Sequence, residues 1–298
     1  MKNKYLKVTL LAVLALSSVN KANAQLNTMS SSYYQNPYLS NPSMAGIAEK
    51  FETSAAVKAQ WTSVDGAPTI QTLTATYGSP GKKLGIGLFL YNESAGLLRR
   101  TNFKATYAYH LKLNSEDQFI DFGASIGALN EWIDLNKVKG DASEQTIQDF
   151  NARKMKFESD FGMAFRTKSL TVQAAIPNLI TTFGKSELED VVDRSLYMAS
   201  AGYKFFAKSG TLTSVEPMVT YRGVANFDDL FDVGVNVQMF ENKLQFNSIY
   251  HNTNSVTVGI GTVYKKQLSI LCQYTTNTAD LQTYSNGEFE IGLKYNIR

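Results

Sequence analysis

Apolar and polar residues alternate with a period of two along most of this chain. In residues 101–113, an aromatic and aliphatic face alternates with a polar face that carries Lys104, His110 and Lys112. Successive side chains of a strand point to opposite faces, so this pattern predicts a strand between two different environments. The pattern predicts fourteen strands, at 51–61, 69–77, 83–91, 101–113, 119–132, 153–166, 170–176, 195–206, 212–222, 229–240, 243–251, 256–264, 268–276 and 288–297.

The connections between these predicted strands fall into two alternating classes. One class is longer, at 62–68, 92–100, 133–152, 177–194, 223–228, 252–255 and 277–287. The other class is shorter, at 78–82, 114–118, 167–169, 207–211, 241–242 and 265–267. Outer-membrane barrels have short turns on the periplasmic side and longer loops outside, whereas a soluble sandwich has no reason to sort its loops in this way. We therefore predict an all-β fold, a transmembrane antiparallel up-and-down β-barrel of about 14 strands, with a range of 12–16.

Aromatic residues favour contact of the apolar faces with lipid. Rings recur near the predicted strand ends, where amphipathic side chains suit the two membrane interfaces. These residues are Tyr77, Tyr91, Trp132, Tyr203, Tyr221, Tyr250, Tyr264 and Tyr274. Glycines recur in the predicted strands, which suits sharp curvature or the close approach of another segment. They are Gly85, Gly87, Gly123, Gly127, Gly202, Gly234, Gly259, Gly261 and Gly292.

The first 24 residues are typical of a secretory signal peptide. Three lysines precede an apolar run at 8–16, and Ala22-Asn23-Ala24 is a small-residue cleavage site. We therefore expect residues 1–24 to be a signal peptide cleaved after Ala24, 25–50 an N-terminal periplasmic or plug segment, and 51–298 the barrel. The exported chain is expected in the cell outer membrane.

The N-terminal segment contains two Asn-Pro steps, Asn36-Pro37 and Asn41-Pro42. Proline fixes φ and lacks a backbone donor, so neither a helix nor a central strand can run through this segment. Its aromatic rings suggest that it packs inside something. We favour a plug or a periplasmic strap, with a simple entry to the first strand as the alternative.

Charge and composition exclude several kinds of function. The chain has 29 basic and 26 acidic residues, and loss of Lys2, Lys4, Lys7 and Lys21 with the signal leaves 25 against 26. This balance gives no electrostatic reason to expect nucleic acid as a partner. The single cysteine, Cys272, and the two histidines, His110 and His251, provide no disulfide framework, metal-ligand spacing or cofactor motif. No run outside the signal is long and apolar enough for a transmembrane helix.

The N-terminal half carries a set of short motifs: the Asn-Pro stretch 34–46, Gln60-Trp61, Pro68-Thr69, Leu84-Gly85-Ile86-Gly87, Asn92-x-x-x-Ala95-Gly96 and 107–113. In these motifs the chain resembles the PorP/SprF family of type IX secretion system membrane proteins. Its motif residues are Tyr34, Asn36, Pro37, Tyr38, Asn41, Pro42, Ala45, Gly46, Gln60 and Trp61. The family more often has Asp at Asn92 and Ala at Ser43, and the second half agrees only in strand pattern and length.

The resemblance implies an outer-membrane protein of a Bacteroidota-type bacterium that is not an enzyme. Such proteins help to export, anchor or couple a large secreted cargo or adhesin, in some cases for gliding motility. The implied partners are the C-terminal sorting domain of the cargo, other type IX secretion components and the lipid bilayer.

Two long loops are the expected docking sites, because binding residues collect on loops held by a rigid scaffold. The candidate partner-docking residues are Lys137, Lys139, Leu179, Ile180, Phe183 and Glu187. The last predicted strand resembles the barrel-assembly signal through Gly292, Tyr295 and Ile297, although Arg298 follows instead of a final aromatic residue.

Two other functions remain open from the sequence. Fatty-acid-type outer-membrane channels also combine fourteen strands with an N-terminal plug, so a transporter for hydrophobic or small solutes is the alternative; the polar inward faces count against it. An outer-membrane hydrolase would need a base next to a nucleophile and an orienting group. His110 and His251 are the only imidazoles, and we expect His251, at a strand end, to face the outer interface.

Overall fold

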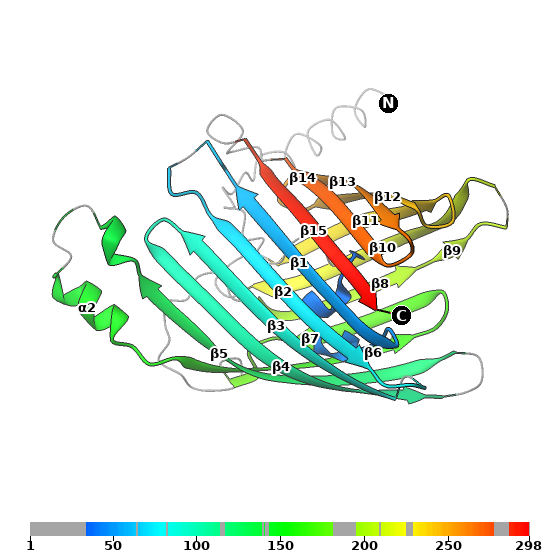
Figure 1. Ribbon diagram of the computed structural model, residues 1–298, viewed down its shortest axis with the longest axis horizontal. Coiled ribbons are helices and arrows are strands. Elements are labelled where there is room, and N and C mark those ends of the chain that lie inside the picture. Colours follow the sequence, from blue (N-terminus) through cyan, green and yellow to red (C-terminus); the bar gives the residue numbers. More distant parts are fainter. Residues whose placement is uncertain are drawn as a thin grey trace, which may run out of the picture.

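The computed structural model describes residues 34–63, 65–81, 83–113, 117–138, 140, 143–180, 195–208, 210–224, 229–276 and 286–297. Its wall is a closed antiparallel sheet (Figure 1). The strands are β1 (Lys50–Gln60), β2 (Thr69–Gly78), β3 (Leu84–Ala95), β4 (Leu98–Lys112), β5 (Phe119–Ile133), β6 (Lys156–Arg166), β7 (Leu170–Ile176), β8 (Ser195–Tyr203), β10 (Leu212–Val224), β11 (Leu230–Met239), β12 (Leu244–His251), β13 (Ser255–Tyr264), β14 (Leu268–Thr275) and β15 (Glu288–Ile297).

Three pairings complete the ring: β15 pairs with β1, and β10 pairs with both β8 and β11. The two-residue β9 (Phe205–Phe206) continues the line of β8 and also pairs with β10. Closure gives every strand a neighbour on each side, which backbone hydrogen bonding in lipid requires. The predicted fold, an antiparallel barrel of fourteen strands, is confirmed.

One predicted loop is wrong. The chain over 92–100 does not form a loop, because β3 continues to Ala95, β4 begins at Leu98, and only Gly96 and Leu97 turn between them. Gly96 has a φ of 56°, as the first turn residue of a type II′ hairpin requires. Arg100 lies opposite Glu93 in this extension and forms an ion pair with it at 3.0 Å. Both faces of the two strands are polar there. The sequence therefore no longer alternates between apolar and polar residues, although the backbone pairing of β3 with β4 continues.

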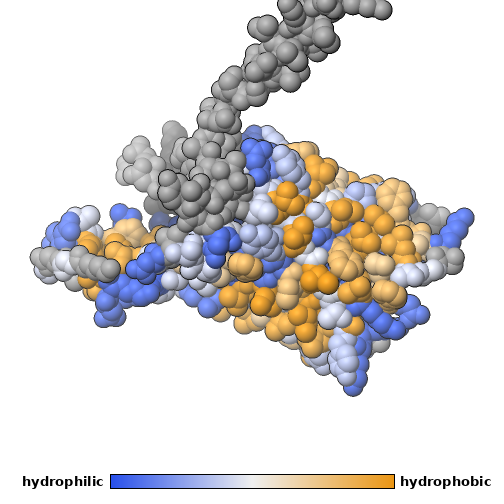
Figure 2. Space-filling view, turned by 90° about the horizontal axis from the view of Figure 1, so that it is seen from above, coloured by the Kyte–Doolittle hydropathy of each residue, from blue (hydrophilic) through white to orange (hydrophobic). Residues whose placement is uncertain are grey.

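The burial pattern is inverted relative to a soluble protein. The outward side chains are exposed and apolar, as with Ile126, Ile260 and Tyr107, which are 60%, 53% and 56% exposed. Buried inward positions are mostly polar or charged, among them Thr74, Thr106, Lys104, Gln173, Asn236, Asn247 and Glu288. Figure 2 shows an apolar band on the wall between two polar ends. Such a band is the surface that a bilayer covers.

The two ends of the barrel differ. The turns after β2, β4, β6, β8, β11 and β13 lie at one end together with the end of β15, on the right in Figure 1. We call this the short-turn end; its longest simple connection is 113–118, one residue longer than the predicted 114–118. The other end carries 134–155, with η4 (Leu135–Lys137) and α2 (Gln145–Asn151). Within the described ranges, no helix has the length and hydropathy needed to cross a membrane.

Candidate functional site

The chain before β1 forms a compact segment inside the barrel. We call residues 34–49 the inner segment; it contains the short helical turns η2 (Pro37–Leu39) and η3 (Pro42–Met44). Each turn begins with proline, whose fixed φ and missing donor suit the first helical position. The Asn41 side chain accepts a hydrogen bond from the Ser43 backbone N–H at 2.9 Å, which caps η3. Residues 1–33, including the predicted signal peptide, lie outside the described residues.

Inward-facing glycines make room for the inner segment. A Cβ added at Gly87 would lie 2.6 Å from the Tyr38 ring. A Cβ at Gly123 would overlap the backbone of Pro42 and Ser43, and one at Gly85 would overlap the carbonyl of Ala45. Several of the glycines noted in the sequence therefore permit close approach of the segment, whereas Gly202 has only ordinary contacts, at 3.5 Å or more.

Hydrogen bonds join the inner segment to the wall on opposite sides of the barrel. Asn36 Nδ2 donates to Thr74 Oγ1 on β2 at 2.8 Å, and Asn41 Nδ2 donates to Gln173 Oε1 on β7 at 3.1 Å. From the facing side, Lys294 Nζ on β15 donates to the Gln35 carbonyl at 2.9 Å. β15 and β7 are separated by half the ring, so the segment spans the interior.

Tyr38 forms the buried centre of this contact. Its hydroxyl lies 2.6 Å from Thr106 Oγ1, and its ring belongs to the small apolar cluster of the interior, with Met44, Ala45, Ala108 and Ala164. Burial raises the pKa of Tyr38 to about 12, so the phenol remains neutral at physiological pH.

Tyr38→Phe tests how much the hydroxyl contributes. We expect a modest loss of stability, about 1–2 kcal/mol, because the Thr106 hydroxyl loses one partner but keeps its contact with Ser125 at 2.7 Å. Urea unfolding in detergent measures the change. A loss as large as that of Tyr38→Ala would show that the hydroxyl, rather than the ring, dominates the contact.

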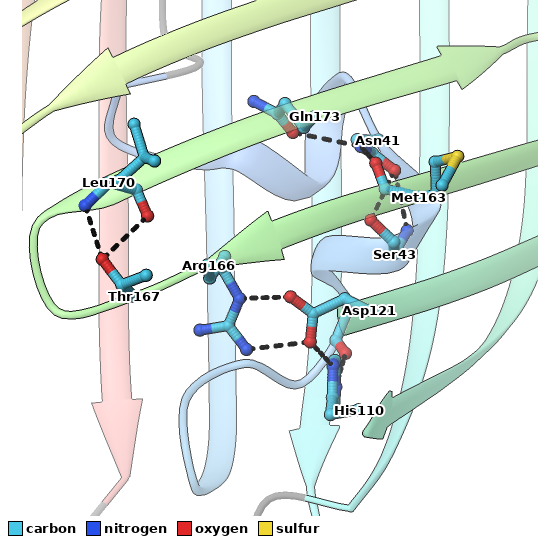
Figure 3. A network of polar contacts seen from close by, with 10 residues as sticks. Asn41, Ser43, His110, Asp121, Met163, Arg166, Thr167, Leu170 and Gln173 are labelled. Atoms are coloured by element: carbon cyan, nitrogen blue, oxygen red, sulfur yellow. Dashed lines mark hydrogen bonds and ion pairs between the residues drawn. The ribbon is translucent and has the colours of Figure 1, made fainter. Parts of the chain in front are cut away.

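His110 links the inner segment to a buried ion pair (Figure 3). Its Nδ1 lies 2.7 Å from Asp121 Oδ1 and its Nε2 lies 3.0 Å from the Ala45 carbonyl. Arg166 on β6 donates two hydrogen bonds to the same Asp121 carboxylate. The imidazole thus bridges the Asp121 carboxylate and the Ala45 carbonyl through its two ring nitrogens. His110 therefore fastens the end of the inner segment to strands β4, β5 and β6.

A second cluster of the same composition lies elsewhere on the wall. His251 Nδ1 is 2.6 Å from Asp232 Oδ1, and Arg222 donates to Asp232 Oδ2 at 2.6 Å. Here the second ring nitrogen of His251 meets the Thr257 hydroxyl at 2.8 Å. The expected position of His251 at the outer interface is wrong: the side chain is 3% exposed and points inward, because residues 247, 249 and 251 share the inward face of β12.

The Thr257, His251 and Asp232 contacts have the connectivity of a nucleophile, a base and an orienting carboxylate. Thr257 is completely buried and also lies 2.7 Å from Thr275 Oγ1. Since no face of the hydroxyl is open to a substrate, a structural role explains these contacts. Over the described ranges, no group of three or more His, Cys, Asp or Glu side chains is placed to hold a metal ion.

The family motif residues divide between two places. The stretch 34–46 lies in the interior, while Gln60 ends β1, and Trp61 follows it, at the opposite end of the barrel from the short turns. Gln60 donates to Glu288 at 2.6 Å, and Lys58 forms an ion pair with Glu288 at 2.7 Å. These residues therefore fasten the β1–β15 junction rather than the inner segment.

The other candidate residues that the structure describes belong to the loops opposite the short-turn end and to β15. Lys137 is exposed at the end of η4, and Ile180 is 46% exposed beyond β7, with Leu179 half-buried beside it. Lys139, Phe183 and Glu187 lie outside the described residues. In β15, Tyr295 and Ile297 are exposed on the outward face and Gly292 is inward.

Sequence reasoning did not identify the wall residues that hold the inner segment. Thr74, Thr106 and Gln173 each bind it from a different strand. The sequence does place these residues on the polar, inward faces of their strands, near inward glycines. That pattern does not say which polar residue contacts which part of the inner segment.

Comparison with known sequences decides the family. The sequence profile described as "Type IX secretion system membrane protein PorP/SprF" matches residues 22–295. The chain belongs to the PorP/SprF family. It is therefore a membrane component of the type IX secretion system, and its barrel places it in the outer membrane. No curated protein sequence matches it.

Solved outer-membrane barrels show limited likeness to this PorP/SprF protein. The Acinetobacter baumannii outer membrane protein Omp33 is 9% identical, covering 85% of this chain and 100% of its own, with a TM-score of 0.49. A Pseudomonas aeruginosa FadL homologue is 10% identical, covering 87% and 93%, with a TM-score of 0.48. A mutant of TodX, a monoaromatic hydrocarbon channel, is 9% identical, covering 90% and 93%, at 0.48. These scores are below 0.5, so the likeness does not bear on function.

Proposed function

We propose that this PorP/SprF protein is a non-enzymatic accessory component that helps to export, anchor or couple a large secreted cargo or adhesin at the cell surface. The cargo's C-terminal sorting domain would dock on the loops at the end opposite the short turns. Other type IX components would contact the same assembly, and a link to gliding motility would depend on the cargo.

The observation that carries this proposal is the inner segment bound across the interior. Its hydrogen bonds to β2, β7 and β15 and its fit against inward glycines support the action of residues 25–50 as a plug. A segment held across the interior favours the loops, rather than a pore, as the working surface. Residues 1–24 would direct export, and Gly292, Tyr295 and Ile297 would present the assembly signal on the last strand.

Two loops are the proposed docking surface. The first is 134–155, which contains α2 and the exposed Lys137. The second begins with Leu179 and Ile180. We include Lys139 of the first loop, and Phe183 and Glu187 of the second, among the proposed docking residues. Exposed apolar residues next to charged ones, on a rigid wall, suit recognition of a folded partner.

The described interior gives little support to the alternative of a hydrophobic-solute transporter. Its buried inward side chains are mostly polar or charged, and two of them, Lys104 and Glu158, form an ion-pair cluster with the half-buried Asp160. A hydrophobic solute would have to pass these charges. Robust solute uptake into liposomes by the pure protein would nevertheless favour transport.

Co-purification from solubilised outer membranes tests docking. We expect wild-type protein to recover one large secreted protein. Leu179→Ser with Ile180→Ser is expected to reduce that recovery about tenfold, which corresponds to about 1.4 kcal/mol of binding free energy. The measurement is quantitative mass spectrometry of the recovered protein.

Leu97→Ser is the matched control. Leu97 is a 40% exposed apolar residue at the same end, in the turn between β3 and β4. Equal losses in both variants would point to general weakening of this end, and undiminished recovery by the 179/180 variant would exclude docking there. Recovery of the barrel alone by wild type would contradict the proposed function.

A further inference from the structure

Three inward-facing amide side chains are buried on the wall formed by β11, β12 and β14. Asn236, Asn247 and Gln273 are 3%, 4% and 5% exposed. The hydrogen bonds that fix the inner segment go to other strands, β2, β4, β7 and β15. A barrel widens with the number of its strands, and side chains alone fill one of about eight strands. In this wider ring, short inward side chains are therefore buried only where something further covers them.

The three amides lie next to one another, and we call them the amide row. Asn236 is opposite Asn247 in the register of the sheet. Gly259, on β13, is opposite both Asn247 and Gln273. A Cβ added at Gly259 would lie 2.0 Å from Asn247 Oδ1 and 2.8 Å from Gln273 Cγ, so these two side chains lie over the glycine. The row is therefore a continuous polar strip on the inward face from β11 to β14.

Two members of the amide row have hydrogen-bonding capacity that the described contacts leave unused. Asn236 Oδ1 and both amide atoms of Asn247, Oδ1 and Nδ2, are buried without a hydrogen-bond partner. Burying such groups unpaired is costly, and folded proteins pair nearly all of them. An amide side chain offers a donor and an acceptor, as a peptide group does. The row therefore fits a polypeptide backbone that passes over it.

The inner segment begins beside the amide row. A Cβ added at Gly234 would lie 2.7 Å from the Tyr34 hydroxyl oxygen, so the Tyr34 side chain meets β11 at this glycine. Gly234 precedes Asn236 by two residues, which is about 7 Å along a strand. The residues that come before Tyr34 in the chain thus start close to the row.

The length and composition of residues 25–33 suit this strip. These nine residues lie between the expected cleavage site and Tyr34, outside the described residues, and extended they would reach about 30 Å. Neighbouring strands are about 4.8 Å apart, so the distance from β11 to β14 is well within that reach. The nine residues carry no charged side chain and include three consecutive serines, Ser30 to Ser32. Small side chains allow close approach of the backbone, and the absence of charge avoids a desolvation cost in a buried site.

We propose that residues 25–33 lie across β12, β13 and β14 and that their backbone hydrogen-bonds to Asn236 and Asn247. The inference rests on the proposed action of residues 25–50 as a plug and adds the site where its first nine residues bind. One continuous stretch of chain would then cover both sides of the interior, the inner segment on β2 to β7 and residues 25–33 on β12 to β14. The competing occupants are the loop 277–285 and a polypeptide from another protein.

Photocrosslinking from Ser31 in the purified full-length protein tests the contact directly. A small diazirine amino acid replaces Ser31, and mass spectrometry identifies the peptides to which it links. We expect links to β12, β13 and β14. Links only to 277–285 or to another protein would assign the amide row to that occupant and overturn the proposal. The absence of any link to the wall would also overturn it.

Thiol labelling tests the role of the two asparagines. In a Cys272→Ser background, a Ser31→Cys thiol is expected to react with a maleimide much more slowly in the folded barrel than after heat denaturation. Asn236→Leu with Asn247→Leu is expected to speed the reaction of the folded protein about tenfold, because two buried hydrogen-bonding side chains are removed. Equal rates in the folded and denatured wild-type wall would overturn the proposal.

Gln71→Leu with Asn130→Leu is the matched control, since it makes the same kind of change at two amides on the outward faces of β2 and β5. Heat-modifiable migration in gels checks that each barrel is folded. Equal labelling of Ser31→Cys in the two double variants would show that Asn236 and Asn247 do not hold the segment. Wall crosslinks from position 31 without recovery of a secreted protein would refute docking on the loops and leave this site standing. Recovery of that protein without wall crosslinks would refute this site alone.

Discussion

Gly123→Ala combined with Gly162→Ala is expected to displace the inner segment while the barrel stays folded. A Cβ at Gly123 would overlap backbone atoms of Pro42 and Ser43, and a Cβ at Gly162 would overlap the Asn41 amide. Backbone atoms cannot rotate away as a flexible side chain can, so the segment must move. Overpacking of a filled interior costs about 1–3 kcal/mol per site, so the displaced population should rise at least tenfold.

Thiol labelling measures the displacement. Ser43 is completely buried, so in a Cys272→Ser background a Ser43→Cys thiol reports exposure of the inner segment to a maleimide. Gly202→Ala is the matched control, because Gly202 is also an inward strand glycine and its added Cβ would meet only ordinary contacts at 3.5 Å. If the Gly123/Gly162 variant is labelled no faster than the Gly202 variant, the glycines do not position the segment.

Asp121→Asn is expected to produce the second large effect, a destabilisation of about 3–5 kcal/mol. The Asp121 side chain is completely buried and binds both Arg166 and His110. The substitution keeps the shape but removes the negative charge, which leaves the Arg166 guanidinium without its compensating charge. It also weakens the orientation of His110, so the Ala45 carbonyl loses its partner and the thiol at position 43 becomes accessible. Urea unfolding and maleimide labelling measure the two consequences separately.

Two further Asp-to-Asn variants separate these consequences. Asp117→Asn, on the same β4–β5 hairpin, changes an exposed carboxylate and should shift stability by no more than about 0.5 kcal/mol. Asp232→Asn removes the carboxylate of the second His and Arg cluster, whose described partners belong to the strands. It should destabilise the barrel as Asp121→Asn does but leave the labelling at position 43 unchanged. Equal labelling in the two buried variants would show that the inner segment responds to barrel stability alone.

The strand pattern was readable because the bilayer imposes it. Each wall strand has lipid on one face and the interior on the other, so β7 and β15 coincide with the predicted 170–176 and 288–297. Prediction failed where that constraint ended. Beyond the apolar band, Glu93 and Arg100 lie opposite each other on paired strands with both faces polar, and no alternation revealed the hairpin.

The candidate site was only partly readable. The proline-broken stretch 34–46 marked a segment that packs against something, and the inward glycines marked a place of close approach. Neither feature identified Thr106 or Gln173 as partners of Tyr38 and Asn41, since these pairs are 68 and 132 residues apart in the chain. The prediction for His251 was wrong because it considered only the position near a strand end. The alternation along β12 puts residue 251 on the inward face.

The sequence by itself determined the barrel, the number of its strands and the two faces of each, because period-two alternation and strand length follow directly from a bilayer around the wall. It also determined the family, through motifs that lie close together in the chain. Only the tertiary structure decided what those motifs contact. Closure of the sheet brings β2, β4, β7 and β15 around the inner segment, and the buried His110, Asp121 and Arg166 meet only when β4, β5 and β6 pair in register. Such contacts depend on register and curvature, which no local pattern encodes.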